Sequence, residues 1–172
     1  MNGKIKEYNY DNGKLEFEGE YLNGKINGKG KEYDSKENLI FVGEYLDGKR
    51  NGKGKEYYKG KLEFEGEYLN GKINGKGKEY DSKENLIFVG EYLDGKRNGK
   101  GKEYYKGKLE FEGEYLNGKI NGKGKEYDSK ENLIFVGEYL DGKRNGKGKE
   151  YYKGKLEFEG EYLNGKINGK GK

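Results

Sequence analysis

The side chains of this chain that could take part in chemistry are its carboxylates, lysines and tyrosines. The 172 residues contain no His and no Cys, which excludes imidazole bases, thiol nucleophiles and ordinary zinc sites. Serine occurs only as Ser35, Ser82 and Ser129, always in the same short polar segment, and we interpret it as a turn residue. The sequence therefore predicts no catalytic residue, no metal site and no cofactor, and we expect a protein that is not an enzyme.

Carboxylates and glycines offer two further routes to chemistry, and both have a simpler explanation. Paired carboxylates could act as general acid and base. However, Glu16 and Glu18 are each expected to face a lysine across a hairpin, which favours a solvated ion-pair ladder. Gly28 and Gly30 lie beside lysines, but the chain has no Walker-type phosphate loop followed by a helix. We interpret these glycines as hairpin residues.

The charge pattern limits the partners that can be expected. The net charge of +4 comes from 36 basic and 32 acidic residues that are interleaved along the chain. A nucleic-acid-binding protein would show a basic stripe without compensating acids, so we expect no nucleic-acid partner. No apolar run is long enough to cross a membrane, and the first residues do not resemble a signal peptide. These features predict a cytoplasmic protein, and for a synthetic chain the question of location does not arise.

These side chains are positioned by structural elements that repeat perfectly along the chain. Residues 15–61 return unchanged as the next 47 residues and again as the 47 after those, and a fourth copy begins at Leu156. Each copy consists of two related halves of 24 and 23 residues. A fixed period of this kind indicates one supersecondary unit stacked into an array. We therefore predict a single array over residues 1–172, with a partial repeat at 1–14 and seven hairpin repeats at 15–172.

Each half-repeat has the pattern of a β-hairpin. Residues 15–21 alternate between glutamates and apolar residues or glycine, which is the period of a half-buried strand. Asn23-Gly24 follows at once, and Asn-Gly strongly favours a type I′ turn. Asp47-Gly48 takes its place in the alternate halves.

A two-residue turn at Asn23-Gly24 fixes which residues face each other. It sets Phe17 opposite Gly30 and Tyr21 opposite Ile26, so that a ring covers a glycine of the neighbouring strand. A bulge or a longer loop at the second Asn-Gly pair of the hairpin is the alternative, and it would shift this pairing.

The links between hairpins complete the predicted fold. Residues 34–38 and 58–61 are short, polar and turn-like, so successive hairpins should be neighbours in one sheet. No stretch shows helical apolar spacing. We predict an all-β fold: an elongated, single-layer, twisted antiparallel meander of stacked β-hairpins with no helix.

Two sets of residues recur at fixed positions, and each receives a predicted role. Aromatic residues on one strand face should form the core, with a peptide-binding groove as a second use: Phe17, Tyr21, Phe41, Tyr45, Phe64, Tyr68, Phe88, Tyr92, Phe111, Tyr115, Phe135, Tyr139, Phe158 and Tyr162. The predicted turn residues are Asn23, Gly24, Asp47, Gly48, Asn70, Gly71, Asp94, Gly95, Asn117, Gly118, Asp141, Gly142, Asn164 and Gly165.

The string FEGEYLNGKINGKG at residues 17–30 is similar to the MORN repeat, whose pattern is aromatic-x-Gly-x-aromatic-x-x-Gly-x-x-x-Gly-x-Gly. The resemblance covers essentially the whole chain. It implies a twisted, grooved sheet of stacked hairpins and a non-catalytic scaffolding role, with partner peptides bound along the groove or phosphoinositide lipids as ligands. The chain departs from the family at Glu32, where an aromatic residue is often found, and at Tyr21, where Trp is common. Because Tyr33 follows one residue later, it should face the other side of the sheet.

Two functions follow from these patterns. The first is a structural repeat scaffold, synthetic or built from a consensus, with no dedicated ligand. The alternative is a natural interaction module that docks a partner peptide or helix in the aromatic groove, or that binds anionic phosphoinositide membranes through Lys25, Lys49 and Arg50. We expect a monomer whose open sheet edges allow edge-to-edge self-association.

Overall fold

The fold is all-β, as the sequence predicts. The structure is a computed structural model that describes residues 2–169 and 171. The described residues form 15 antiparallel strands and no helix, and hence contain no helix that could span a membrane. The chain divides into two compact units, residues 1–85 and residues 86–172, and each is described by itself. The boundaries of the repeat array predicted from the sequence stay a prediction.

The strands of each unit have regular lengths. The first unit contains β1 Gly3–Tyr8, β2 Leu15–Leu22, β3 Lys25–Tyr33, β4 Leu39–Leu46, β5 Lys49–Tyr58, β6 Lys61–Leu69 and β7 Lys72–Tyr80. The second unit contains β8 Leu86–Leu93, β9 Lys96–Tyr105, β10 Lys108–Leu116, β11 Lys119–Tyr127, β12 Leu133–Leu140, β13 Lys143–Tyr152, β14 Lys155–Leu163 and β15 Lys166–Asn168.

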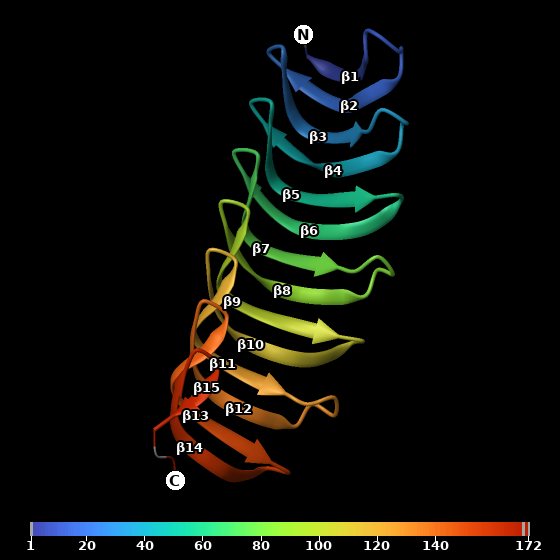
Figure 1. The fold of residues 1–172 in the computed structure, drawn as a ribbon. Coiled ribbons are helices and arrows are strands. Elements are labelled where there is room, and N and C mark those ends of the chain that lie inside the picture. Colours follow the sequence, from blue (N-terminus) through green and yellow to red (C-terminus); the bar gives the residue numbers. More distant parts are fainter. Residues whose placement is uncertain (1, 170, 172) are drawn as a thin grey trace. The chain divides into compact units, whose positions relative to one another are not determined.

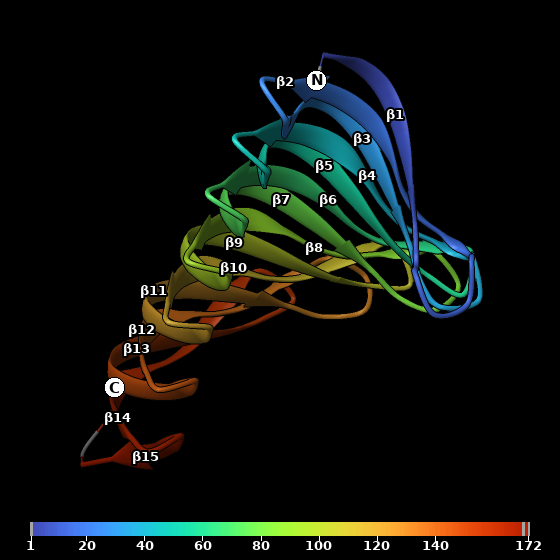
Figure 2. The ribbon, with the colours of Figure 1, turned by 90° about the horizontal axis from the view of Figure 1, so that it is seen from above.

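Within each unit every strand pairs antiparallel with the next strand in sequence, so each unit is a single-layer meander (Figure 1). Figure 2 shows that the strands are bent along their length. No second layer of helices or strands covers either face of a unit in the part of the chain that the structure describes. The side chains of one layer must therefore make the core by themselves.

The turns follow from residues that tolerate positive φ. Asn23 and Gly24 have φ of 52° and 78°, and the link at Lys59 and Gly60 has φ of 50° and 77°, as a type I′ turn requires. The longer link from β3 to β4 is held by Asp34, whose carboxylate accepts backbone hydrogen bonds from residues 36 and 38, both at 2.9 Å. Short links therefore keep consecutive strands adjacent.

The register predicted from a plain two-residue turn is wrong beyond the first two pairs of the hairpin. Tyr21 faces Ile26 as expected, but Phe17 faces Glu32 instead of Gly30. The alternative with a bulge at the second Asn-Gly pair is the observed structure: Gly28 has a φ of 99°. A carboxylate oxygen of Glu20 accepts a hydrogen bond from the backbone of residue 29 at 3.2 Å, which stabilises the bulge. Because the shift is two residues, each side chain keeps its face of the sheet.

The core is a row of phenylalanine rings that lie directly on glycine backbone. Phe41 has no exposed surface, and Gly43 and Gly54 face each other beneath its ring. A methyl group on either glycine would lie 2.4 Å from Cζ of Phe41. The tyrosines Tyr45 and Tyr68 pack edge-on against this ring, with centroid distances of 5.7 and 5.2 Å. Glycine is therefore required at these positions to make room for the ring.

The bend of the strands encloses this aromatic row. Arg50 and Glu56 are six residues apart on β5, a span of about 20 Å in a straight strand, yet their side chains form an ion pair at 2.9 Å. The strand must bend toward the side on which they lie, which is the side of Phe41 because Arg50 stacks on its ring. We call the face that carries Phe41, Tyr45 and Arg50 the concave face, and the opposite face the convex face.

Two glycine substitutions distinguish the steric reason for a glycine from the conformational one. Gly43→Ala should lower the free energy of unfolding by about 3 kcal/mol, because the added methyl group displaces the Phe41 ring. Gly48→Ala, in the turn, meets no atom within 4 Å but has a φ of 82°, and it should cost about 1 kcal/mol. Urea unfolding followed by circular dichroism measures both, and equal losses would contradict the ring-on-glycine packing.

Candidate functional site

The structure places most of the aromatic candidates in the core and the turn candidates at the surface. Tyr21 and Phe158 are half-buried. The buried ones are Phe17, Phe41, Tyr45, Phe64, Tyr68, Phe88, Tyr92, Phe111, Tyr115, Phe135, Tyr139 and Tyr162. All the predicted Asn-Gly and Asp-Gly turn residues are exposed, and each has positive φ. The aromatic rings therefore hold the strands together on the concave face.

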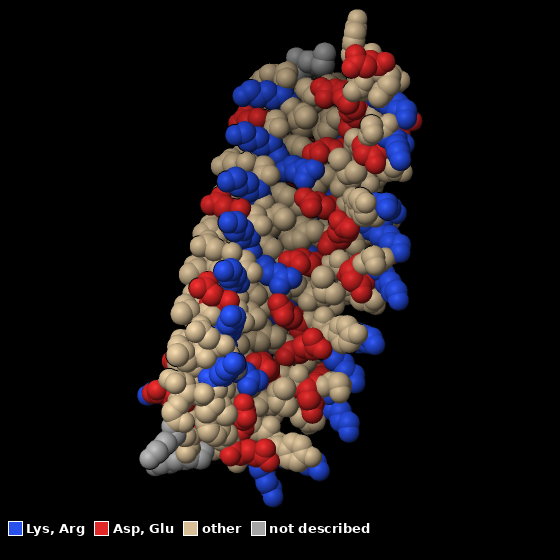
Figure 3. Space-filling model, viewed as in Figure 1, with Lys and Arg blue, Asp and Glu red and all other residues tan. Residues whose placement is uncertain are grey.

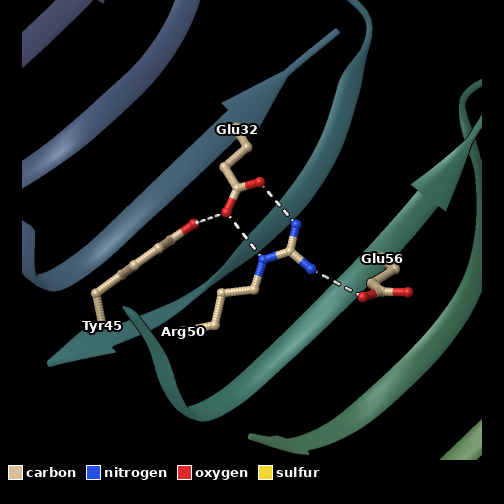
Figure 4. A network of polar contacts seen from close by, with 4 residues as sticks. All are labelled: Glu32, Tyr45, Arg50 and Glu56. Atoms are coloured by element: carbon tan, nitrogen blue, oxygen red, sulfur yellow. Dashed lines mark hydrogen bonds and ion pairs between the residues drawn. The ribbon is translucent and has the colours of Figure 1, made fainter. Parts of the chain in front are cut away.

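A polar cluster lies on the aromatic row, and Figure 4 shows the four residues that form it. The guanidinium of Arg50 lies 3.9 Å above the centroid of the Phe41 ring. It donates two hydrogen bonds to Glu32, at 2.9 and 2.7 Å, and one to Glu56 at 2.9 Å. The hydroxyl of Tyr45 donates to the same Glu32 carboxylate at 2.6 Å. We call Glu32, Tyr45, Arg50 and Glu56 the Arg50 cluster, and it joins strands β3, β4 and β5.

The second unit contains the same cluster, built from an identical copy of the sequence. Arg144 donates to Glu126 at 2.8 and 2.7 Å and to Glu150 at 3.0 Å, and Tyr139 donates to Glu126 at 2.5 Å. The guanidinium again lies 3.9 Å above a phenylalanine ring. The cluster is therefore a regular product of the repeat.

The glutamates of this cluster are absent from the residues that sequence reasoning selected as a site. The sequence marks Glu32 only as a departure from a position that often holds an aromatic residue. It lies two residues after Gly30, so the period-two alternation places it on the concave face. As expected from the one-residue step, Tyr33 lies on the other face, where its hydroxyl donates to Glu18 at 2.8 Å. The signal that could have found the cluster is the replacement of Ile26 by Arg50 in alternate hairpins.

The electrostatics of the cluster fix one protonation state near neutral pH. Burial alone would raise the pKa of Glu32, but hydrogen bonds from Arg50 and Tyr45 outweigh it and hold that pKa below its usual value. Burial, and then the hydrogen bond to Glu32, raise the pKa of Tyr45. Glu32 therefore stays ionised and Tyr45 stays protonated at pH 7.

The next hairpin shows what happens where the arginine is missing. Tyr68 occupies the place of Tyr45, but Ile73 faces it where Arg50 faces Tyr45. The hydroxyl of Tyr68 is buried and has no hydrogen-bond partner of good geometry among the described residues. Burial first, and then the negative charge of Glu56 and a weak hydrogen bond to it, raise the pKa of Tyr68. Two hairpins with nearly identical backbones thus differ in how they satisfy a buried hydroxyl.

The serine turns and the carboxylates, the remaining candidates for chemistry, show no arrangement of a reactive site among the described residues. The backbone carbonyl of Ser35 accepts a hydrogen bond from the ammonium of Lys14 at 2.8 Å, as Ser82 does from Lys61 at 2.6 Å. The described residues contain no group of three or more carboxylates arranged to hold a metal ion. Figure 3 shows that basic and acidic side chains are interspersed on the visible face of each unit.

Removing the hydroxyl of Tyr45 or that of Tyr68 tests how much the Arg50 cluster stabilises the fold. Tyr45→Phe should lower the free energy of unfolding by about 1.5–3 kcal/mol, because a hydrogen bond to an ionised carboxylate is lost. Tyr68→Phe is the matched control and should cost clearly less, because the hydroxyl of Tyr68 makes no hydrogen bond of good geometry to the neighbouring carboxylate of Glu56. Urea unfolding curves decide between them, and an equal loss in both variants would show that the cluster does not stabilise the fold.

Acid should destabilise the protein through the same carboxylates. The pKa values of Glu32 and Glu126 lie below their ordinary value of 4.5 in the folded state. Their stabilising contribution is therefore complete above that pH, and it is lost as the pH falls through the lower folded-state values. The double variant Glu32→Gln, Glu126→Gln should lose stability less steeply on acidification. Urea midpoints measured from neutral to acid pH check this, and identical slopes would refute it.

Comparison with known proteins agrees with this geometry. A search of the curated proteins gave no match. The family model for the MORN repeat matches residues 17–38, 41–61, 64–85, 88–108, 111–132, 135–155 and 158–172. Each match begins at the phenylalanine of a hairpin, and together the matches cover most of the chain. The resemblance stated from the sequence is confirmed, and the chain belongs to the MORN repeat family.

Proposed function

We propose that this protein is a non-catalytic structural scaffold whose concave face takes no ligand. The MORN repeat is a structural repeat, and a chain built from it is a repeat scaffold or an interaction module. The proposal selects the scaffold because the side chains of the concave face are used in contacts between neighbouring strands.

The observation that carries this proposal is the layering above Phe41. The ring is fully buried on glycine backbone, and the side chain of Arg50, whose guanidinium lies on it, is only 23% exposed. That guanidinium is bound to Glu32 and Glu56 by three hydrogen bonds. A peptide that docked on the ring would have to displace Arg50 and leave two partly buried carboxylates without their partner, which costs several kcal/mol.

Identity between the copies supports an engineered or consensus origin as part of the proposal. Copies in natural arrays accumulate differences, and their terminal repeats become caps. Here residues 15–61 recur without a single change. A natural gene that encodes three identical copies would contradict this part of the proposal.

Tyrosine nitration of the native protein tests whether the concave face is closed. Tyr58 is 56% exposed and Tyr45 is 5% exposed, and the copies of each in the other repeats form one class with it. Tetranitromethane should modify the Tyr58 class and spare the Tyr45 class. The two classes fall in different tryptic peptides, so mass spectrometry measures them separately even though the copies are identical. Unfolding in urea should make both classes react, which is the control. Equal nitration of both classes in the native protein would show an open aromatic groove and refute the proposal.

A further inference from the structure

The convex face carries a row of charges with a regular gap. The row crosses neighbouring strands, which pair Glu18 with Lys31, Lys31 with Val42 and Val42 with Lys55. In the first unit the row reads Lys6, Glu18, Lys31, Val42, Lys55, Glu65 and Lys78. Lysine stands on every second strand, whereas valine takes every second glutamate position. The row therefore has a net positive charge, and a glutamate is absent wherever valine stands.

The hairpins that keep the glutamate show what this row binds. The carboxylate of Glu18 accepts hydrogen bonds from the Lys31 ammonium at 3.0 Å and from the Tyr33 hydroxyl at 2.8 Å, and Lys6 lies 3.8 Å from it. The bonds from Lys31 and Tyr33 hold the pKa of Glu18 below its usual value. The same contacts recur around Glu112 in the second unit. This part of the convex face is thus built to hold a carboxylate.

The alternate hairpins have the same surroundings without the carboxylate. Val42 replaces the glutamate. Its two cross-strand neighbours, Lys31 and Lys55, are 48% and 51% exposed, and each pairs with the glutamate on its other side, Glu18 at 3.0 Å and Glu65 at 3.5 Å. Their backbones are about 10 Å apart, two strand spacings, so a carboxylate above Val42 would share both lysines with these glutamates. Tyr57 holds the position in this hairpin that Tyr33 has in the preceding one. In the second unit, Val136 lies between Lys125 and Lys149 in the same way.

A hollow in each unit reaches these valines. In the first unit it has a volume of about 520 Å³, and Val42, Lys31 and Gly30 are among the residues that line it. The hollow of the second unit is of similar size and is lined by Val136 and Lys149, among others. Glycine backbone forms part of the floor of each hollow, and lysines and glutamates from several strands form the sides. The glutamates are Glu18 and Glu20 in the first unit and Glu138, Glu159 and Glu161 in the second. Each hollow extends across the strands, so an extended chain could lie in it.

We propose that the convex face of each unit binds an acidic peptide in an extended conformation, with one carboxylate above Val42 in the first unit or above Val136 in the second. The peptide carboxylate would take the place that Glu18 and Glu112 fill in the other hairpins, between two lysines and beside a tyrosine. An acidic peptide fits because the row is basic and because the group it already holds is a carboxylate. This inference goes beyond the scaffold function and does not depend on the concave face.

Filling the gap with a side chain of the protein tests the proposal. Fluorescein-labelled poly-L-glutamate is titrated with the full chain at low salt, and binding is followed by fluorescence anisotropy. Val89 is the copy of Val42 in the repeat between the two sites, and it faces Lys102. The variant Val42→Glu, Val89→Glu, Val136→Glu should bind at least about tenfold more weakly, because its own carboxylates occupy the sites. The matched variant with Gln at these three positions should bind within about twofold of the parent chain, because it adds a similar volume without charge.

A second control separates the site from general charge attraction. Leu46→Glu, Leu93→Glu, Leu140→Glu adds the same number of negative charges at exposed positions next to the turns, and it should weaken binding much less than the valine variant. Equal weakening by both triple variants, or no binding by the parent chain, would overturn the proposal. The Glu variant should fold, because Glu18 already occupies this position in other hairpins, and circular dichroism checks this. If it does not fold, Lys55→Gln with Lys149→Gln must weaken binding instead, and unchanged binding would refute the site.

Discussion

The packing of one phenylalanine ring on two facing glycines is the interaction on which the rest of this structure depends. A single-layer sheet has no second layer against which to bury its apolar face, so the core must be made within the layer. Glycine permits it, because without a Cβ the backbone of Gly43 and Gly54 lets the ring of Phe41 lie directly upon it. The strands bend around the ring, and tyrosines from two hairpins close its edges.

The bend then decides where charges can meet. Arg50 and Glu56 belong to one strand and touch only because that strand curves around the aromatic row. On the concave face this produces an arginine stacked on a ring and held by two carboxylates. On the convex face the same backbone carries lysines, with Glu18 and Val42 in equivalent places. The backbone therefore repeats with each hairpin, whereas the chemistry of both faces repeats with each pair of hairpins.

Much of the fold could be predicted from local patterns. Alternation in residues 15–21 predicts the strands, Asn-Gly and Asp-Gly predict the turns, and short links predict the meander. The register could not be read in the same way, because the bulge at Gly28 shifts the pairing by two residues. A shift of two preserves the face of every side chain, so the apolar pattern is the same with or without it. Only the hydrogen bond accepted by the carboxylate of Glu20 and the positive φ of Gly28 distinguish the bulged register from the plain one.

The sequence by itself determined the all-β class, the hairpin period, the tight turns and the set of aromatic residues, because these follow from spacing within a few neighbouring residues. The tertiary structure alone decided that Arg50 stacks on Phe41 and binds Glu32, 18 residues away in the chain. It also decided which two facing glycines lie beneath each ring, and that Lys31 and Lys55 flank an uncharged position. These contacts depend on strand register and on bending, which local patterns in the sequence do not fix by themselves.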